Sequence, residues 1–225
     1  MIELFQLPWS PYCLVIHRIL QYSGTRFKVV DIPAGNRDLI WKITRERYYK
    51  VPVVRDGDNV IFETDENSQV IAKYLDQKLG LDLFPPQWEG VQTLLWRYFE
   101  NDVESITFKL NDIFSRNMVP EKHWLAHLRH KERRFGVGCI ETWKKQQPEL
   151  LKQLQELLIP CEQMLATRPF LLDSRPLFVD FDLWGMLANF LYSGEYQLSK
   201  QQPYLREWHK RMSSLAFVDR EKLHP

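Results

Sequence analysis

Two side chains in the segment LPWSPYC, residues 7–13, could take part in chemistry: the hydroxyl of Ser10 and the thiol of Cys13. The segment follows a short apolar run and precedes residues with the apolar spacing of a helix. Serine before proline is typical of a helix start, with serine as the N-cap and proline in the first turn. Unpaired backbone N–H groups at that end carry partial positive charge, so we expect this place to stabilise an anion.

The composition is that of a compact globular protein. Hydrophobic residues make up 44% of the 225 residues, and they include eight Trp and thirteen Phe. The 30 Lys and Arg nearly balance the 29 Asp and Glu, so we expect neither nucleic acid nor an anionic membrane as a partner. No apolar run approaches the length of a membrane span.

The three cysteines, Cys13, Cys139 and Cys161, are odd in number and match no zinc-binding spacing. This usage favours free thiols in a reducing compartment. Glu3 lies within the first apolar run and no basic segment precedes it, so a cleaved signal peptide is not expected. These features favour a cytoplasmic location.

The first part of the chain alternates strand and helix patterns. Two apolar runs that flank a polar turn indicate a hairpin, and a strand-helix-strand unit requires parallel strands with a right-handed crossover. The expected elements are a strand at 2–7, a helix at 11–23, a strand at 26–31, a short helix at 37–47, hairpin strands at 51–55 and 60–62, and a helix at 65–79.

A glycine and two consecutive prolines mark a boundary at residues 80–87. We therefore predict two domains, 1–79 and 88–225, joined by this linker. Pro160 should kink or split the helix that contains it. The helices expected beyond the boundary are 88–116, 120–134, 137–146, 149–167, 179–192 and 202–213.

The Ser-Pro-Tyr-Cys turn, the Val51-Pro52 pair before a hairpin and the segment NSQVIAKYL at residues 67–75 together resemble the cytosolic glutathione transferases. The resemblance spans nearly the whole chain and extends to residues 168–171, Val179-Asp180 and residues 204–208. It implies an α/β, thioredoxin-like N-terminal domain that binds glutathione, followed by an all-α C-terminal domain that binds the electrophile.

The resemblance implies that Ser10 donates a hydrogen bond to the sulfur of glutathione. A thiol of ordinary pKa, about 8.5, is mostly protonated at neutral pH, and a pKa two units lower requires roughly 2.7 kcal/mol of preferential thiolate stabilisation. A hydroxyl and helix-terminal N–H groups are a plausible source. The alternative is that Ser10 only caps its helix, which is the more common role of such a motif taken alone.

In thioredoxin-like folds the proline at the position of Pro52 is cis, and the preceding residue, here Val51, binds the glutathione backbone. An ordinary proline at the start of a strand is the alternative. Lys50 could reach a glutathione carboxylate, although a solvated lysine is an equally good interpretation.

Family members commonly carry an acidic residue and then serine at the start of the last helix of the first domain. There the acid holds the ammonium of the γ-glutamyl group, and the serine hydroxyl and the helix N–H groups hold its carboxylate. Ser68 matches the serine, whereas Asn67 replaces the acid. We expect Glu66 to bind the ammonium group instead, with Asp65 as the alternative. Helix capping would explain the same residues without a ligand.

Glutaredoxin-like relatives use a Cys-Pro-Tyr-Cys turn whose first cysteine is the nucleophile, and Ser10 occupies that place here. Cys13 lies one turn inside the helix, where a lone thiol more often serves as a small apolar residue. Thiol-disulfide exchange through Cys13 is therefore the minor interpretation.

Two further features of the second domain are ambiguous. His123, His127 and His130 could share one helix face and bind a metal, but the basic residues around them favour a solvated face. Aromatic residues should supply a hydrophobic cleft, although most will belong to the core or to a dimer interface. The candidates are Trp96, Tyr98, Phe99, Phe108 and Phe114.

The late helix departs from the family pattern, because Leu177 stands where a capping serine or threonine is usual. Asp180 is present, but a reciprocal capping box is not expected without that hydroxyl. We expect the helix to form nevertheless.

These observations predict a glutathione S-transferase that joins the glutathione thiolate to a small hydrophobic electrophile, as in detoxification. Glutathione would be a co-substrate, and no cofactor or metal is expected. A homodimer is implied by the family. The alternatives are a non-catalytic binding or regulatory protein on the same scaffold and a thiol-disulfide oxidoreductase that uses Cys13.

Overall fold

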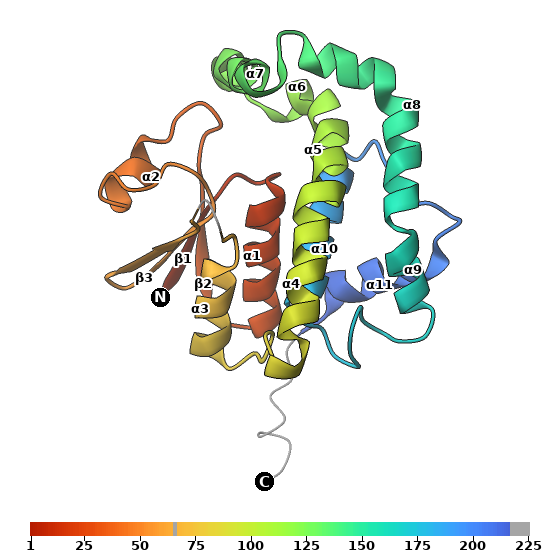
Figure 1. The fold of residues 1–225 in the computed structure, drawn as a ribbon. Helices are drawn as coiled ribbons and strands as arrows, with labels where there is room; N and C mark the ends of the chain where they lie inside the picture. Colours follow the sequence, from red (N-terminus) through yellow and green to blue (C-terminus); the bar gives the residue numbers. More distant parts are fainter. Residues whose placement is uncertain (65–66, 217–225) are drawn as a thin grey trace.

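The computed structural model describes residues 1–64 and 67–216. Figure 1 shows a small sheet with its helices on one side of the molecule and a larger group of helices on the other. The expected fold class, a thioredoxin-like α/β part followed by an all-helical part, is confirmed. The proposed domain limits at 79 and 88 stay a prediction.

The first part forms a four-stranded sheet in the order β2-β1-β3-β4, in which β1 is parallel to β2 and antiparallel to β3. The order matches the expected crossover followed by a hairpin. The elements are β1 (Ile2–Gln6), α1 (Pro11–Ser23), β2 (Phe27–Asp31), α2 (Asp38–Ile43), β3 (Val53–Asp56), β4 (Asn59–Phe62) and α3 (Val70–Leu79).

Alternation along the strands assigns side chains to the two faces of the sheet. Leu4 and Val54 belong to the main core, which contains the buried residues of α1 and α3. Phe5 and Val53 point to the other face, where they form a small cluster with Ile40 of α2. The site therefore rests on a sheet that is packed on both faces.

Helix α3 begins later than expected. The prediction was residue 65, whereas the helix starts at Val70, and Asn67 and Ser68 lie in the turn before it. Glu63, the residue after β4, accepts hydrogen bonds from the N–H groups of Val70 at 2.8 Å and Ile71 at 3.2 Å. This carboxylate caps the helix from outside its own sequence, so local capping signals misplaced the start.

The second part is helical among the described residues. Its elements are η1 (Pro86–Trp88), α4 (Glu89–Tyr98), the π-helical segment η2 (Phe99–Val103), α5 (Glu104–Ile113), α6 (Ser115–Met118), α7 (Glu121–Phe135), α8 (Cys139–Leu157), α9 (Ile159–Leu165), α10 (Phe178–Leu191) and α11 (Pro203–Ser214).

Two prolines in this part behave differently. The break expected from Pro160 is confirmed, because α8 ends at Leu157 and α9 places Pro160 in its first turn. The predicted break between residues 146 and 149 is wrong, since α8 continues through Pro148. Burial of residues on both sides of Pro148, Trp143 and Leu150, holds the helix together across the missing hydrogen bond.

Only one half of a capping box forms at the start of α10. The N–H of Leu177 donates to Asp180 Oδ2 at 3.0 Å, and the N–H of Asp180 donates to the Leu177 carbonyl at 3.0 Å. Asp180 also accepts hydrogen bonds from the Leu171 N–H and the Trp208 indole. The Leu177 side chain offers no acceptor to the Asp180 N–H, so the reciprocal box is missing as expected, and the helix forms nevertheless.

Helix α10 lies against α1, the helix that begins at the Ser-Pro turn. A Cβ atom at Gly185 would lie 2.3 Å from the Val15 side chain and 2.9 Å from the Pro11 carbonyl, so only glycine permits this approach. One turn further on, Asn189 Nδ2 donates to the Trp9 carbonyl at 2.7 Å. Helix α10 therefore fixes the position of residues 7–13.

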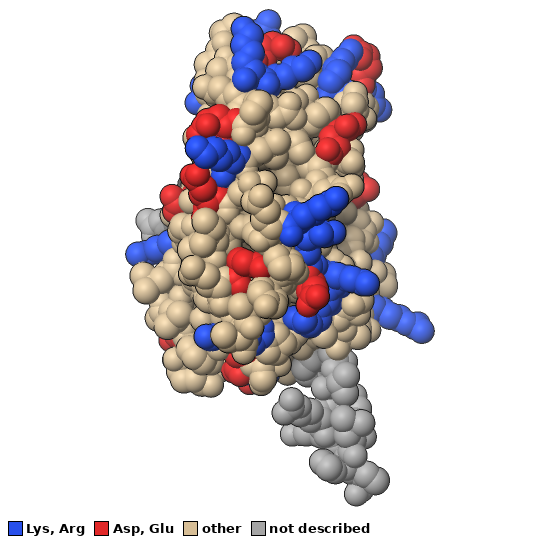
Figure 2. Space-filling model, turned by 90° about the vertical axis from the view of Figure 1, so that its right-hand side faces the viewer, with Lys and Arg blue, Asp and Glu red and all other residues tan. Residues whose placement is uncertain are grey.

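The surface carries no dominant charge on the face seen in Figure 2, where basic and acidic side chains lie among one another. This agrees with the near balance of 30 basic and 29 acidic residues in the chain. Among residues 1–64 and 67–216, none of the helices combines the length and the apolar composition needed to cross a lipid bilayer.

Candidate functional site

Two neighbouring cavities open between the sheet domain and the helices, and each contains one of the serines singled out above. The Ser10 cavity has a volume of about 440 Å³ and the Ser68 cavity about 530 Å³. Tyr12, Lys50 and Val51 line both cavities, as does Arg134 of α7. Because the two cavities share these walls, an elongated ligand could occupy both.

Ser10 ends the turn that leads into α1. Its backbone is extended (φ −68°, ψ 127°), its carbonyl accepts the Leu14 N–H at 2.9 Å, and its side chain makes no capping hydrogen bond. The hydroxyl lines the Ser10 cavity at the helix N-terminus. The simple capping role is therefore not what the side chain performs here.

Cys13 is fully buried and lines neither cavity. The Leu7 N–H donates to its sulfur at 3.4 Å. Burial raises the pKa of the Cys13 thiol to about 11, although the hydrogen bonds from Leu7 and Ser10 act in the opposite direction. A thiol of this kind is protonated at neutral pH and shielded from reagents, which disfavours disulfide exchange.

The Val51-Pro52 peptide bond is cis, as the resemblance implied. Val51 and Lys50 line both cavities, and Pro52 lines the Ser68 cavity. The fold therefore brings these three residues to the boundary between the cavities, next to the turn that carries Ser10.

The predicted γ-glutamyl residues are partly brought together. Ser68 lines the Ser68 cavity, where its hydroxyl donates to Glu100 and accepts the Trp96 indole N–H at 2.8 Å. Asn67 lines the same cavity and accepts the Gln69 N–H at 2.8 Å, which is a local turn contact. Glu66 and its alternative Asp65 lie outside the described residues.

One expectation about this place requires correction. The first N–H groups of the helix were expected to receive the γ-glutamyl carboxylate, but the N–H groups of Val70 and Ile71 already donate to Glu63. Glu63 is buried and lines the Ser68 cavity, and burial raises its pKa to about 8 despite these two hydrogen bonds.

Sequence reasoning missed two residues of the site. Glu100, in η2, lines the Ser68 cavity and contacts Ser68, and burial raises the pKa of its carboxyl. No local signal marks it, because the contact spans 32 positions of sequence. Tyr12 lines both cavities, and burial together with nearby carboxylates raises its pKa, which keeps the phenol protonated. Its place beside Ser10 in the motif was an available signal.

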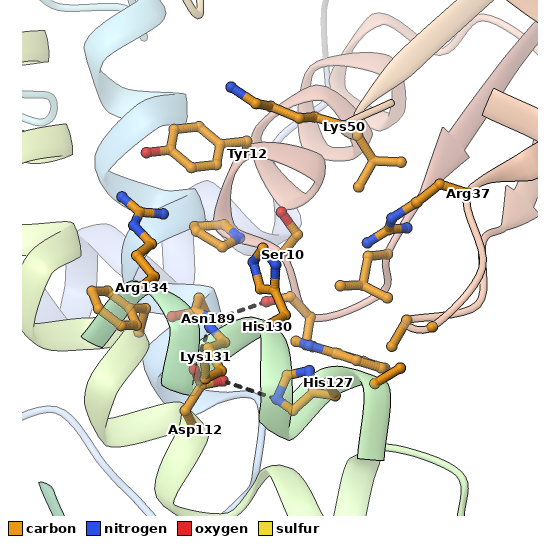
Figure 3. A pocket seen from close by; sticks show the side chains of 18 of the residues that line it. Ser10, Tyr12, Arg37, Lys50, Asp112, His127, His130, Lys131, Arg134 and Asn189 are labelled. Carbon is orange, nitrogen blue, oxygen red and sulfur yellow. Dashed lines mark hydrogen bonds and ion pairs between the residues drawn. The ribbon is translucent and has the colours of Figure 1, made fainter. Parts of the chain in front are cut away.

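The far wall of the Ser10 cavity comes from α7 and from the loop after β2. Figure 3 shows Ser10 with Arg37 from this loop and with His130 and Arg134 from α7. Gly35 permits the loop to approach α7, since a Cβ there would lie 3.1 Å from both Ala126 Cβ and His123 Nδ1. Helix α7 and this loop therefore form the wall of the cavity that faces Ser10.

The histidines of α7 do not form a metal site. His127 is buried, stacks on Trp124, and has a pKa lowered by burial to about 4. Among the described residues, no group of three or more His, Cys, Asp or Glu side chains could hold a metal ion. The predicted solvated face is wrong for His127, which packs into the protein and lines the Ser10 cavity.

The aromatic candidates divide between cavity and core. Trp96 lines the Ser68 cavity and Phe108 lines the Ser10 cavity. Phe99 is fully buried, Tyr98 donates to the Leu157 carbonyl, and Phe114 packs edge-on against Tyr196. The periodicity of the helix alone could not separate these roles.

Comparison with solved structures supports the fold over the whole chain. A glutathione transferase from Phanerochaete chrysosporium superposes with a TM-score of 0.81 at 18% identity, covering 97% of this chain and 98% of that one. A glutathione S-transferase of Ceriporiopsis subvermispora, solved in complex with glutathione, gives a TM-score of 0.77 at 15% identity and covers 94% and 95%. An enzyme from Xylella fastidiosa gives 0.66 at 15% identity and covers 95% and 93%.

A comparison with curated protein sequences finds no match. Two family models nevertheless match the chain, the glutathione S-transferase N-terminal domain over residues 4–82 and the glutathione S-transferase C-terminal domain over residues 125–211. The two matches follow one another in the order expected from the fold. The chain therefore belongs to the glutathione S-transferase family.

Proposed function

We propose that the protein conjugates glutathione to small electrophiles and that Ser10 stabilises the reacting thiolate. The thiol proton passes to solvent, the sulfur attacks an electrophilic carbon, and a carbon–sulfur bond replaces the bond to the leaving group. The observation that carries this proposal is the Ser10 hydroxyl, which lines a cavity at the N-terminus of α1 without capping the helix.

The binding mode follows from the two joined cavities. We assign the γ-glutamyl group to the Ser68 cavity, the peptide backbone to Val51 and Pro52, and the sulfur to the vicinity of Ser10. Lys50 lines both cavities and would serve a glutathione carboxylate. Arg97 lines the Ser68 cavity and supplies a cation for the γ-glutamyl carboxylate.

Glu100 is our candidate for the ammonium group of glutathione. It lines the Ser68 cavity beside Ser68, and Asn67 has no negative charge to offer at the place where the family commonly has an acid. An ammonium ion in contact with Glu100 would favour the ionised carboxylate that burial disfavours.

Ser10→Ala should lower kcat/KM for conjugation of an aryl halide by about a hundredfold, the usual cost of removing one donor to a developing anion. Glutathione affinity, measured by calorimetry, should change little. Ser23→Ala is the matched control, because Ser23 ends the same helix far from the cavity and its hydroxyl makes only local contacts, donating to the Leu20 carbonyl and accepting from the Thr25 N–H. Unchanged turnover in Ser10→Ala would contradict the role of Ser10.

Glu100→Gln should weaken glutathione binding about tenfold by removing a buried charge opposite the ammonium group. Wild-type affinity should also fall as the pH drops through the raised pKa of Glu100. The control ligand is a glutathione analogue without the α-amino group, which both proteins should bind equally. If the variant loses affinity for both ligands alike, Glu100 does not bind the ammonium.

The oxidoreductase alternative requires an accessible thiol. The described structure buries Cys13, Cys139 and Cys161, and burial raises the pKa of each. We expect no fast reaction of the native protein with a disulfide reagent and three reactive thiols after denaturation. Rapid labelling of Cys13 in the native protein, mapped by mass spectrometry, would contradict this expectation and support the oxidoreductase alternative.

A non-catalytic role on the same scaffold would show as a folded protein without measurable glutathione binding. The proposal also includes a homodimer, for which the exposed Val91 and Leu94 of α4 supply apolar surface. A detoxifying role in the cytoplasm, with glutathione as a co-substrate and no further cofactor, completes the proposal.

A further inference from the structure

The Ser10 cavity concentrates positive charge that the chain as a whole lacks. Five Lys and Arg side chains line it against two carboxylates, whereas 30 basic and 29 acidic residues nearly cancel over the chain. Figure 3 shows Arg37 from the loop after β2, and Lys131 and Arg134 from α7, around Ser10. The charge is therefore a property of the cavity itself.

The two carboxylates of the cavity offset little of this charge. Asp112 is ion-paired with Lys131. Glu104 is largely buried, and burial raises its pKa to about 7, so it is partly protonated near neutral pH. In the part of the chain that the structure describes, Arg37, Arg133 and Arg134 form no ion pair.

Arg37 adds an unsatisfied donor. Its Nη1 is buried and has no hydrogen-bond partner among the described residues, although the side chain lines the cavity. A buried N–H group without an acceptor is costly, so an anion at this place would be stabilised.

The same cavity has an apolar wall in contact with its cations. Phe108 and Phe135 pack with ring centroids 5.1 Å apart. The Lys131 ammonium lies 5.1 Å from the Phe108 ring centroid, and the Arg134 guanidinium lies 5.1 Å from that of Phe135. A ligand with an apolar body and an anionic group would match both features.

We propose that the acceptor substrate is an aromatic electrophile that carries a carboxylate, with its ring against Phe108 and Phe135 and its charge held by Arg133 and Arg134. This inference deepens the proposed function and rests on it. Glutathione, which we assign to Val51, Pro52 and the Ser68 cavity, does not account for Arg133 of α7, whereas Arg134 lines both cavities. Arg133 lines the Ser10 cavity but not the Ser68 cavity.

The test compares a chlorodinitrobenzoate with the corresponding neutral chlorodinitrobenzamide, each relative to its uncatalysed reaction with glutathione. In both, the thiolate displaces chloride from the ring. We expect the ratio of kcat/KM to the uncatalysed rate constant to be about tenfold larger for the benzoate than for the benzamide. Because salt screens the charges, this preference should shrink at about 0.5 M salt. Arg133→Gln should reduce the preference by raising the KM of the benzoate.

Two controls make the result specific. Arg129→Gln removes a cation from the same helix but outside both cavities and should keep the preference. Calorimetry should give Arg133→Gln nearly wild-type glutathione affinity, because Arg133 lines the Ser10 cavity but not the Ser68 cavity. Equal acceleration of both electrophiles, or a preference for the benzamide, would overturn the inference and leave the proposed function standing. Failure to conjugate either electrophile would overturn both.

Discussion

The contact between α1 and α10 is the constraint on which the candidate site depends. Gly185 lets the backbone of α1 approach within a distance that any side chain would prevent, and Asn189 holds the Trp9 carbonyl. At the other end of α10, Asp180 accepts three buried hydrogen bonds. The Ser-Pro turn is thus fixed from the helical part, although its chemistry belongs to the sheet part.

Burial separates the two groups that the turn brings close together. Cys13 points into the core, where desolvation disfavours its thiolate, whereas Ser10 faces a cavity in which the field of the helix N-terminus and surrounding cations favour an anion. The turn therefore keeps the Cys13 thiol protonated and unreactive, while Ser10 offers a place for the thiolate of a bound ligand. Three positions of sequence separate the two side chains that meet these different surroundings.

Patterns within one element were predictable from the sequence. The parallel strand pair, the hairpin, the helix at the Ser-Pro turn and the helix break at Pro160 follow from local rules. The cis bond at Pro52 follows once the fold is recognised. What escaped prediction depends on contacts between distant segments. Glu63 sets the start of α3, and Glu100 reaches Ser68 across the boundary between the two parts.

The central claim is that Ser10 lowers the pKa of the thiol of bound glutathione. The most direct measurement is a pH titration of bound glutathione by the ultraviolet absorbance of its thiolate, in the wild type, Ser10→Ala and Tyr12→Phe. Our account predicts a thiol pKa well below the ordinary value of about 8.5 in the wild type and Tyr12→Phe, and a return toward that value in Ser10→Ala. An unshifted pKa in the wild type, or a return only in Tyr12→Phe, would contradict it.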